Sequence, residues 1–137
     1  MKKRVSMSIV GLMMSAANAA NLEVEIKGIS AIEGNLMIVA YGSADDMQNS
    51  TNAWQKVIRK VSAQQETLHF ADVAPGQYGF MIFQDLDGDF TLATNLFGIP
   101  SEPYGFSNNP VVHGRPDFAD IAFVMGSENQ TISISLE

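Results

Sequence analysis

The stretch that decides the fold is "ETLHFADVAPGQYGFMIFQD", residues 66–85. Two runs rich in apolar, β-branched and aromatic residues flank its centre, and each run has the length of a β-strand. Between them, Pro75 presets φ for a turn, and Gly76 accepts the positive φ that a type II corner requires. The stretch therefore predicts two strands joined by a tight turn.

Strand patterns continue on both sides of this stretch. Residues 22–27 alternate apolar and charged side chains, which is typical of a half-buried strand. The run "NLMIVAY", residues 35–41, is continuously apolar and has strand length. Downstream, "DIAFVM" (residues 120–125) and "TISISLE" (residues 131–137) predict two further strands, with "GSEN" between them as a hairpin loop.

The segment "NAWQKVIRKVSAQQ", residues 52–65, has apolar positions that fit both a helix and an edge strand. We expect a short helix or irregular turn near residues 47–54, followed by a strand. About seven short strands without a long helix predict an all-β fold, a single antiparallel β-sandwich of immunoglobulin-like or transthyretin-like type. True immunoglobulin domains carry a cysteine–tryptophan–cysteine signature, and this chain has no cysteine.

The first 19 residues have the pattern of a secretory signal. A basic head of two lysines and an arginine precedes a mostly apolar stretch, and Ala17, Asn18 and Ala19 match the small-x-small cleavage pattern. We predict cleavage after Ala19, a domain of residues 20–137, and a periplasmic or secreted protein. An uncleaved anchor or a buried helix is the alternative. The apolar run is shorter than the roughly 20 residues of a permanent span, so we expect no membrane span after cleavage.

The charge of the predicted domain restricts its partners. Beyond residue 19, the remaining 118 residues hold five basic and 15 acidic side chains, a net charge of −10. This charge opposes binding to nucleic acid or anionic lipid and favours cations or basic partners. Because the chain has no cysteine, an exported domain cannot use disulfides and has to be stabilised by its core or by something it binds.

An acidic loop follows the second strand of the opening stretch. Asp85, Asp87 and Asp89 occupy alternating positions, and Gly88 allows the backbone to curl tightly. Calcium prefers about six to eight oxygen ligands, and carboxylates at alternating positions of a turn can converge on one ion. The spacing therefore predicts a candidate calcium site, with calcium as the possible cofactor.

This loop is not an EF-hand, because Phe90 and Leu96 stand where that motif needs glycine and a bidentate glutamate. A site would have to be completed by Thr94, Asn95 and Glu102 further along the chain, and we expect a dissociation constant of roughly 0.1–1 mM. The competing interpretation is a solvated turn whose side chains bond to nearby backbone amides. Both interpretations stay open.

A hydrolase that uses Asp87, Asp89 or Glu102 is the third interpretation. A flexible acidic turn offers neither the rigid spacing nor the apolar pocket that separates the pKa values of two catalytic carboxyls. The two histidines fall on an exposed strand face (His69) and in a loop (His113). We therefore expect a protein that is not an enzyme.

A long segment with little strand pattern, residues 85–117, carries the remaining candidates. Its aromatic and apolar side chains argue against disorder, so we expect one long ordered loop. These side chains could pin the loop over an open end of the sandwich. Alternatively, Tyr104 and Phe106 form a partly exposed platform for a protein, peptide or glycan ligand, which would make the chain a periplasmic binding or adaptor protein.

Two motifs, "VAPGQYGFMIFQDLDGD" (residues 73–89) and "TNLFGIPSEPYGFSNN" (residues 94–109), resemble the secreted bacterial family known as domain of unknown function 2141. The resemblance implies a transthyretin-like β-sandwich, export and no assigned activity. This chain departs from the family pattern at Gln84 (usually His), Phe90 (usually Gly) and Ala93 (usually Asp). The last departure removes a carboxylate that a cation site could use.

Overall fold

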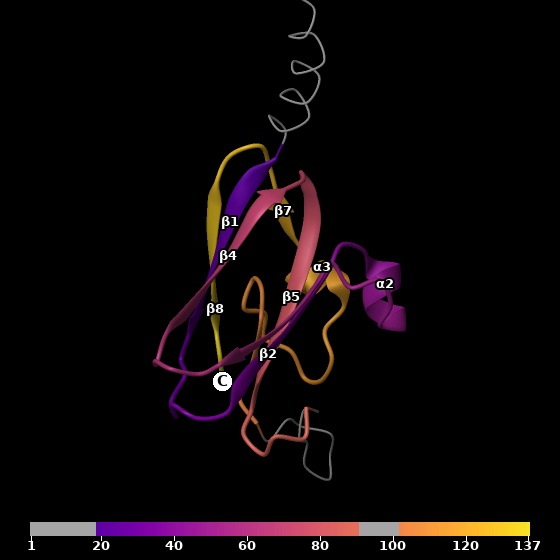
Figure 1. The fold of residues 1–137 in the computed structure, drawn as a ribbon. Helices are drawn as coiled ribbons and strands as arrows, with labels where there is room; N and C mark the ends of the chain where they lie inside the picture. Colours follow the sequence, from indigo (N-terminus) through magenta and orange to yellow (C-terminus); the bar gives the residue numbers. More distant parts are fainter. Residues whose placement is uncertain (1–18, 91–101) are drawn as a thin grey trace, which may run out of the picture.

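The computed structural model describes residues 19–90 and 102–137 (Figure 1). The predicted signal peptide therefore lies, except for Ala19, outside the described residues. Within those two ranges, no helix has the length and apolar character needed to cross a bilayer.

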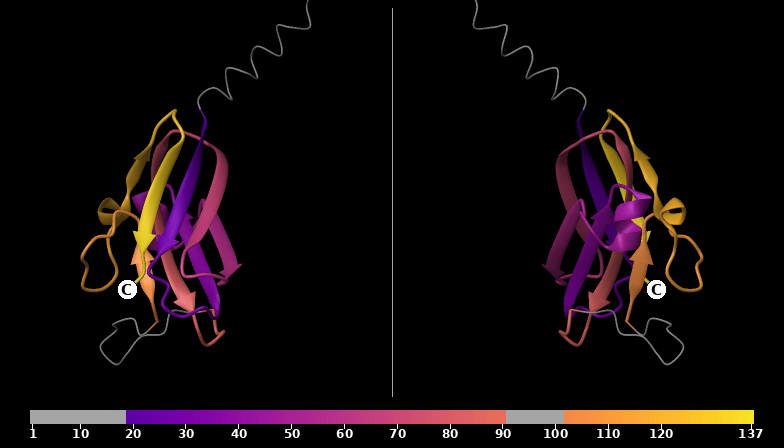
Figure 2. Two further views of the ribbon diagram at one scale, coloured as in Figure 1. Left: turned by 90° about the vertical axis from the view of Figure 1, so that its left-hand side faces the viewer. Right: turned by 90° about the vertical axis from the view of Figure 1, so that its right-hand side faces the viewer.

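In the described part of the chain, eight strands form two sheets that face each other (Figure 2). The first sheet has the order β4-β1-β8 and consists of β1 (Ala20–Lys27), β4 (Glu66–Val73) and β8 (Gln130–Ser135). The second has the order β3-β2-β5-β6, with β7 also paired to β5, and consists of β2 (Asn35–Tyr41), β3 (Gln55–Lys60), β5 (Gly76–Asp85), β6 (Tyr104–Phe106) and β7 (Phe123–Met125). The predicted all-β sandwich is confirmed.

The core lies between the two sheets. Alternate residues of β1 point into it, and Leu22, Val24 and Ile26 are fully buried, as the period of two predicted. Trp54 packs against this core, with its ring centroid 4.4 Å from that of Tyr78. The domain therefore has one main apolar core, filled by inward-facing side chains of both sheets.

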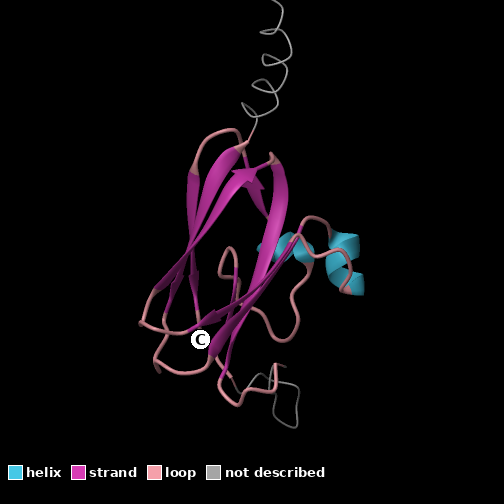
Figure 3. Ribbon diagram, in the orientation of Figure 1, coloured by secondary structure: helices cyan, strands magenta, loops and turns pink. Residues whose placement is uncertain are grey.

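Two short helices, α2 (Ala44–Asn49) and α3 (Phe118–Ile121), lie together on the outer side of the second sheet (Figure 3). Helix α2 begins earlier than the predicted 47–54 because the Ser43 hydroxyl caps it and accepts the Asp46 N–H at 3.2 Å. Met47 of α2 and Ile121 of α3 form a second, smaller apolar cluster with Tyr41. This cluster covers only one end of the outer face.

The turn of the opening stretch carries the chain from one sheet to the other. Strand β4 ends at Val73 in the first sheet, and β5 begins at Gly76 in the second. The Tyr78 hydroxyl donates a hydrogen bond of 2.7 Å to the Ala74 carbonyl, which fixes this corner from the core side. The two predicted strands are confirmed, but the corner is not the predicted type II turn, because Gly76 has φ +156° rather than the roughly +80° of that turn.

Several strand pairings differ from the prediction. Strand β1 pairs with β8 in parallel, so the sandwich is not wholly antiparallel. The "GSEN" segment is not a hairpin loop, because β7 pairs with β5 and β8 pairs with β1. Strand β6 lies inside the predicted loop, and Asp120 and Ile121 belong to α3 rather than to a strand. These features depend on partners far away in the sequence, which local periodicity does not encode.

The end of β5 is held closely against the connection between β1 and β2. Gln84 is fully buried, and its side-chain amide donates to the carbonyls of Ala31 and Glu33 at 2.8 Å each. Gly34 has φ +70°, and a Cβ atom built there would lie 2.2 Å from the Asp85 carbonyl oxygen. Only glycine tolerates both the positive φ and this approach. The strand therefore reaches Asp85 in a fixed position.

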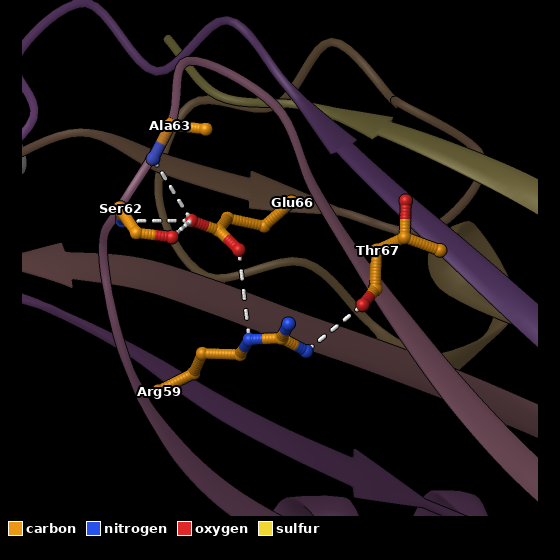
Figure 4. Close-up of polar contacts among 5 residues, drawn as sticks. All are labelled: Arg59, Ser62, Ala63, Glu66 and Thr67. Atoms are coloured by element: carbon orange, nitrogen blue, oxygen red, sulfur yellow. Dashed lines mark hydrogen bonds and ion pairs between the residues drawn. The ribbon is translucent and has the colours of Figure 1, made fainter.

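A buried carboxylate links the edges of the two sheets (Figure 4). Glu66 of β4 accepts hydrogen bonds at Oε2 from the amides of Ser62 (2.8 Å) and Ala63 (3.1 Å), and Arg59 Nε of β3 lies 3.5 Å from its Oε1. Arg59 also donates to the Thr67 carbonyl at 2.8 Å. Burial alone would raise the pKa of Glu66, but these hydrogen bonds and the Arg59 charge outweigh it and lower the pKa below its ordinary value.

This lowered pKa predicts a pH-dependent contribution to stability. A carboxyl with a depressed pKa stabilises the fold above its unfolded pKa of 4.5, and the contribution is lost as the pH falls through the folded value. We expect Glu66→Gln to reduce the free energy of unfolding by about 1–2 kcal/mol at pH 7. The difference from the unchanged protein should shrink below pH 4.5.

Urea unfolding at several pH values measures this effect. Glu128→Gln, in an exposed loop, is the matched control and should leave stability unchanged at each pH. A Glu66→Gln penalty of the same size at acid and neutral pH would contradict the assignment.

Candidate functional site

The carboxylates of the acidic loop meet where β5 ends and β6 begins. Phe83 of β5 pairs with Tyr104 of β6 in an antiparallel register. Asp85 lies two residues beyond Phe83, and Glu102 lies two residues before Tyr104, so the pairing brings their backbones to the same end of the sheet. The carboxylates that offer one oxygen each within 4.8 Å of one another are Asp85, Asp87, Asp89 and Glu102.

Two members of this cluster are buried and oriented by backbone amides. Asp85 is 1% exposed, and its two carboxylate oxygens accept the N–H groups of Gly88 and Phe90, both at 3.0 Å. Glu102 is 6% exposed, and its Oε2 accepts the Leu86 N–H at 2.7 Å. Hydrogen bonds to a charged acceptor are stronger than neutral ones, so these amides hold the carboxylates in place.

The other two members, Asp87 and Asp89, are exposed. The Asp89 N–H donates to Asp87 Oδ1 at 3.2 Å, and this bond on its own lowers the pKa of Asp87. The side chains of Asp89 and Asp85 act in the opposite direction, and the net pKa of Asp87 is raised, because neighbouring carboxyls disfavour another negative charge. A bound cation would remove this repulsion.

The structure thus brings together four of the five predicted calcium ligands. Asn95, the fifth, lies outside the described residues, as does Thr94. Four carboxylates at this spacing suit a hard cation such as calcium. The amides that bond to Asp85 also fit the competing interpretation of a turn held by its own side chains. The calcium site therefore stays a prediction.

The histidines lie on other parts of the fold. His69 is on β4 in the first sheet, with its side chain 73% exposed and Nδ1 3.4 Å from Glu23. His113 is exposed in the segment before α3. Both positions agree with the sequence interpretation of a strand face and a loop.

Tyr104 and Phe106 do not pin a loop over the open end of the sandwich. They belong to strand β6, where both are half-buried, and their ring centroids are 5.6 Å apart in an edge-on arrangement. Because Phe106 pairs with Met81 and Tyr104 with Phe83, both aromatic side chains join the outer face of the second sheet.

On this outer face, the register aligns side chains from four strands in two rows. The first row consists of Ile58, Met37, Phe83 and Tyr104. The second row consists of Lys56, Val39, Met81 and Phe106. They form the floor of a groove of about 500 Å³, which the segment 114–116 also borders. This volume lies within the range of roughly 300–1,000 Å³ that is typical of small-molecule sites. We call this feature the outer-face groove.

The sequence predicts only the Tyr104 and Phe106 edge of this groove. The sequence does hold a signal for the rest, because residues 36–41 are apolar on both faces of the strand. Continuous apolar runs indicate strands that are covered on both sides. The structure shows that one side meets the core and that the other forms the groove floor.

The fold and site define a small all-β sandwich with an apolar groove and a carboxylate cluster at one end of its second sheet. The family described as "Uncharacterized protein conserved in bacteria (DUF2141)" matches residues 24–133, and the chain belongs to this family. The resemblance of the two motifs is thereby confirmed. No curated protein and no solved structure matches the chain, so the immunoglobulin-like or transthyretin-like subtype stays a prediction.

Proposed function

We propose that the protein is an exported, non-enzymatic binding module that takes up a small apolar molecule in the outer-face groove. The observation that carries this proposal is the pair of registered rows, which leaves apolar side chains of four strands half-buried or exposed on the outer face. Val39, Met81 and Phe106 also pack against the cluster of Tyr41, Met47 and Ile121. Ile58 at the β3 end of one row is 60% exposed. Contiguous exposed apolar surface in a small domain is typical of a binding site.

The groove suits binding more than catalysis. Its floor belongs to paired strands, so it is preformed and a ligand need not order it. Apolar contact contributes roughly 25 cal/mol for each Å² removed from water. Among the described residues that line the groove, none is an aspartate, glutamate or histidine, the side chains that most often act as general acids and bases.

A groove variant with a matched control tests the proposal. N-phenylnaphthylamine, an uncharged apolar fluorophore, should bind saturably, and Ile58→Glu should weaken binding about tenfold, because a charge replaces an apolar contact. Val124→Glu is the control: Val124 is 65% exposed on β7 and does not line the groove, so this change should have no effect. Equal effects of the two variants, or no saturable binding, would contradict the proposal.

Export is the second part of the proposal, and it is supported by the sequence of the first 19 residues. When the full-length chain is expressed in a Gram-negative host, we expect it in the periplasmic fraction with Ala20 as its first residue. Intact mass and N-terminal sequencing measure this. Ala17→Leu or Ala19→Leu should block cleavage, since the processing site requires small residues. Retention of the unprocessed chain in the cytoplasm would exclude export.

A second candidate function is binding of calcium to the four carboxylates, favoured by ligand oxygens within 4.8 Å of one another. Such an ion would stabilise the junction of β5 and β6, because its ligands come from both sides of that junction. It would act beside the groove rather than inside it, since none of the four carboxylates lines the groove.

Thermal unfolding with EDTA and with millimolar calcium tests this candidate. Calcium at 10- to 100-fold above its dissociation constant should raise the melting temperature by about 3–8 °C. Asp87→Asn should abolish the shift, whereas Asp72→Asn, an exposed aspartate on β4 outside the cluster, should preserve it. An unchanged melting temperature would favour the solvated turn.

A further inference from the structure

The charged residues that line the outer-face groove are cationic. Within the described part of the chain, the charged lining residues are Lys56 and Arg115, and both are exposed. Basic side chains are scarce, since residues 20–137 contain five of them against 15 acidic ones, and the net charge opposes anionic ligands over most of the surface. The two cations of the groove are a local exception. An apolar groove flanked by two of these five cations is complementary to a molecule with an apolar body and a negative group.

The two ends of the groove differ in charge. Lys56 pairs with Val39, which pairs with Met81, so the lysine is aligned with the row farther from the acidic cluster. Asp85 lies four residues after Met81 on the same strand, roughly 13 Å further along the sheet. The row of Asp85 also holds Lys60, because both residues pair with Asn35, so it carries charges of both signs, whereas the row of Lys56 carries a positive charge alone. A negative group is therefore favoured at Lys56.

Arg115 is anchored at the groove by helix α2. Its Nη2 donates a hydrogen bond of 2.6 Å to the Met47 carbonyl. A guanidinium carries five N–H donors, and this bond uses one of them. The planar fork of arginine matches the two oxygens of a carboxylate, so an anchored arginine beside an apolar floor suits a carboxylate head group.

We propose that the outer-face groove binds a single-chain amphiphile with a carboxylate head, such as a fatty acid anion. The chain lies along the apolar rows, and the head lies at Lys56 and Arg115. This inference rests on the proposed binding function and names its ligand class. Adjacent strands lie about 4.8 Å apart, so a row that crosses from β3 to β6 spans about 14 Å. This span matches the length of the extended chain of dodecanoate.

Calorimetric titration of the purified protein with dodecanoate, below its micelle concentration, tests the inference. EDTA is present so that calcium soaps do not form and the calcium candidate does not affect the result. We expect one molecule bound per chain, and we expect Lys56→Glu to weaken binding roughly fivefold. Lys27→Glu is the control, because it makes the same charge change on β1 in the other sheet and should leave the affinity unchanged.

Dodecyl maltoside has the same alkyl chain and an uncharged head. It therefore tests the binding function of the groove separately from the assignment of a carboxylate head. We expect Lys56→Glu to leave its affinity unchanged. If both amphiphiles bind but Lys56→Glu and Lys27→Glu affect dodecanoate equally, the carboxylate assignment is wrong and the binding function stands. If neither amphiphile binds but N-phenylnaphthylamine does, the amphiphile assignment is wrong and the binding function stands; if none of the three binds, both proposals are wrong. If Ile58→Glu converts a dimer into a monomer and no amphiphile binds, the face is an interface between copies of this chain.

Discussion

The pairing of β2 with β5 is the constraint on which the rest of the structure depends. It runs without interruption from Asn35 and Asp85 to Tyr41 and Gly79. Because side chains alternate between the two faces of a strand, this one register sends Ile82 into the core and Met81 to the outer face. A slip of one residue would exchange the two sets. The same hydrogen bonds therefore define the core and the groove floor.

The end of this pairing also sets the charge distribution of the outer face. Strand β5 ends at Asp85, and the pairing of β5 with β6 brings Glu102 to the same place. Lys56 belongs to the row farther from this carboxylate cluster, and Arg115 also lines the groove. One sheet face thus carries two chemically distinct features, a carboxylate cluster and an apolar groove that Lys56 and Arg115 line.

Local patterns predicted many of the elements but not their partners. The strands that flank Pro75 and the alternation of Leu22, Val24 and Ile26 follow from the sequence alone, because a period of two is a local property. The parallel pairing of β1 with β8 does not, since the two strands are more than a hundred residues apart. The predicted range 47–54 is wrong for α2 because the Ser43 cap starts the helix at Ala44, and a serine before a helix is a local signal of its start.

By itself, the sequence determined the positions of β1, β2, β4 and β5, the turn at Pro75 and the acidic triplet that begins at Asp85. Only the tertiary structure decided that Glu102 joins this triplet and that Lys56 and Arg115 flank one groove. The reason is physical. Alternation specifies that a strand has two faces, but which face is covered depends on hydrogen-bond register and on packing between segments that are distant in the chain.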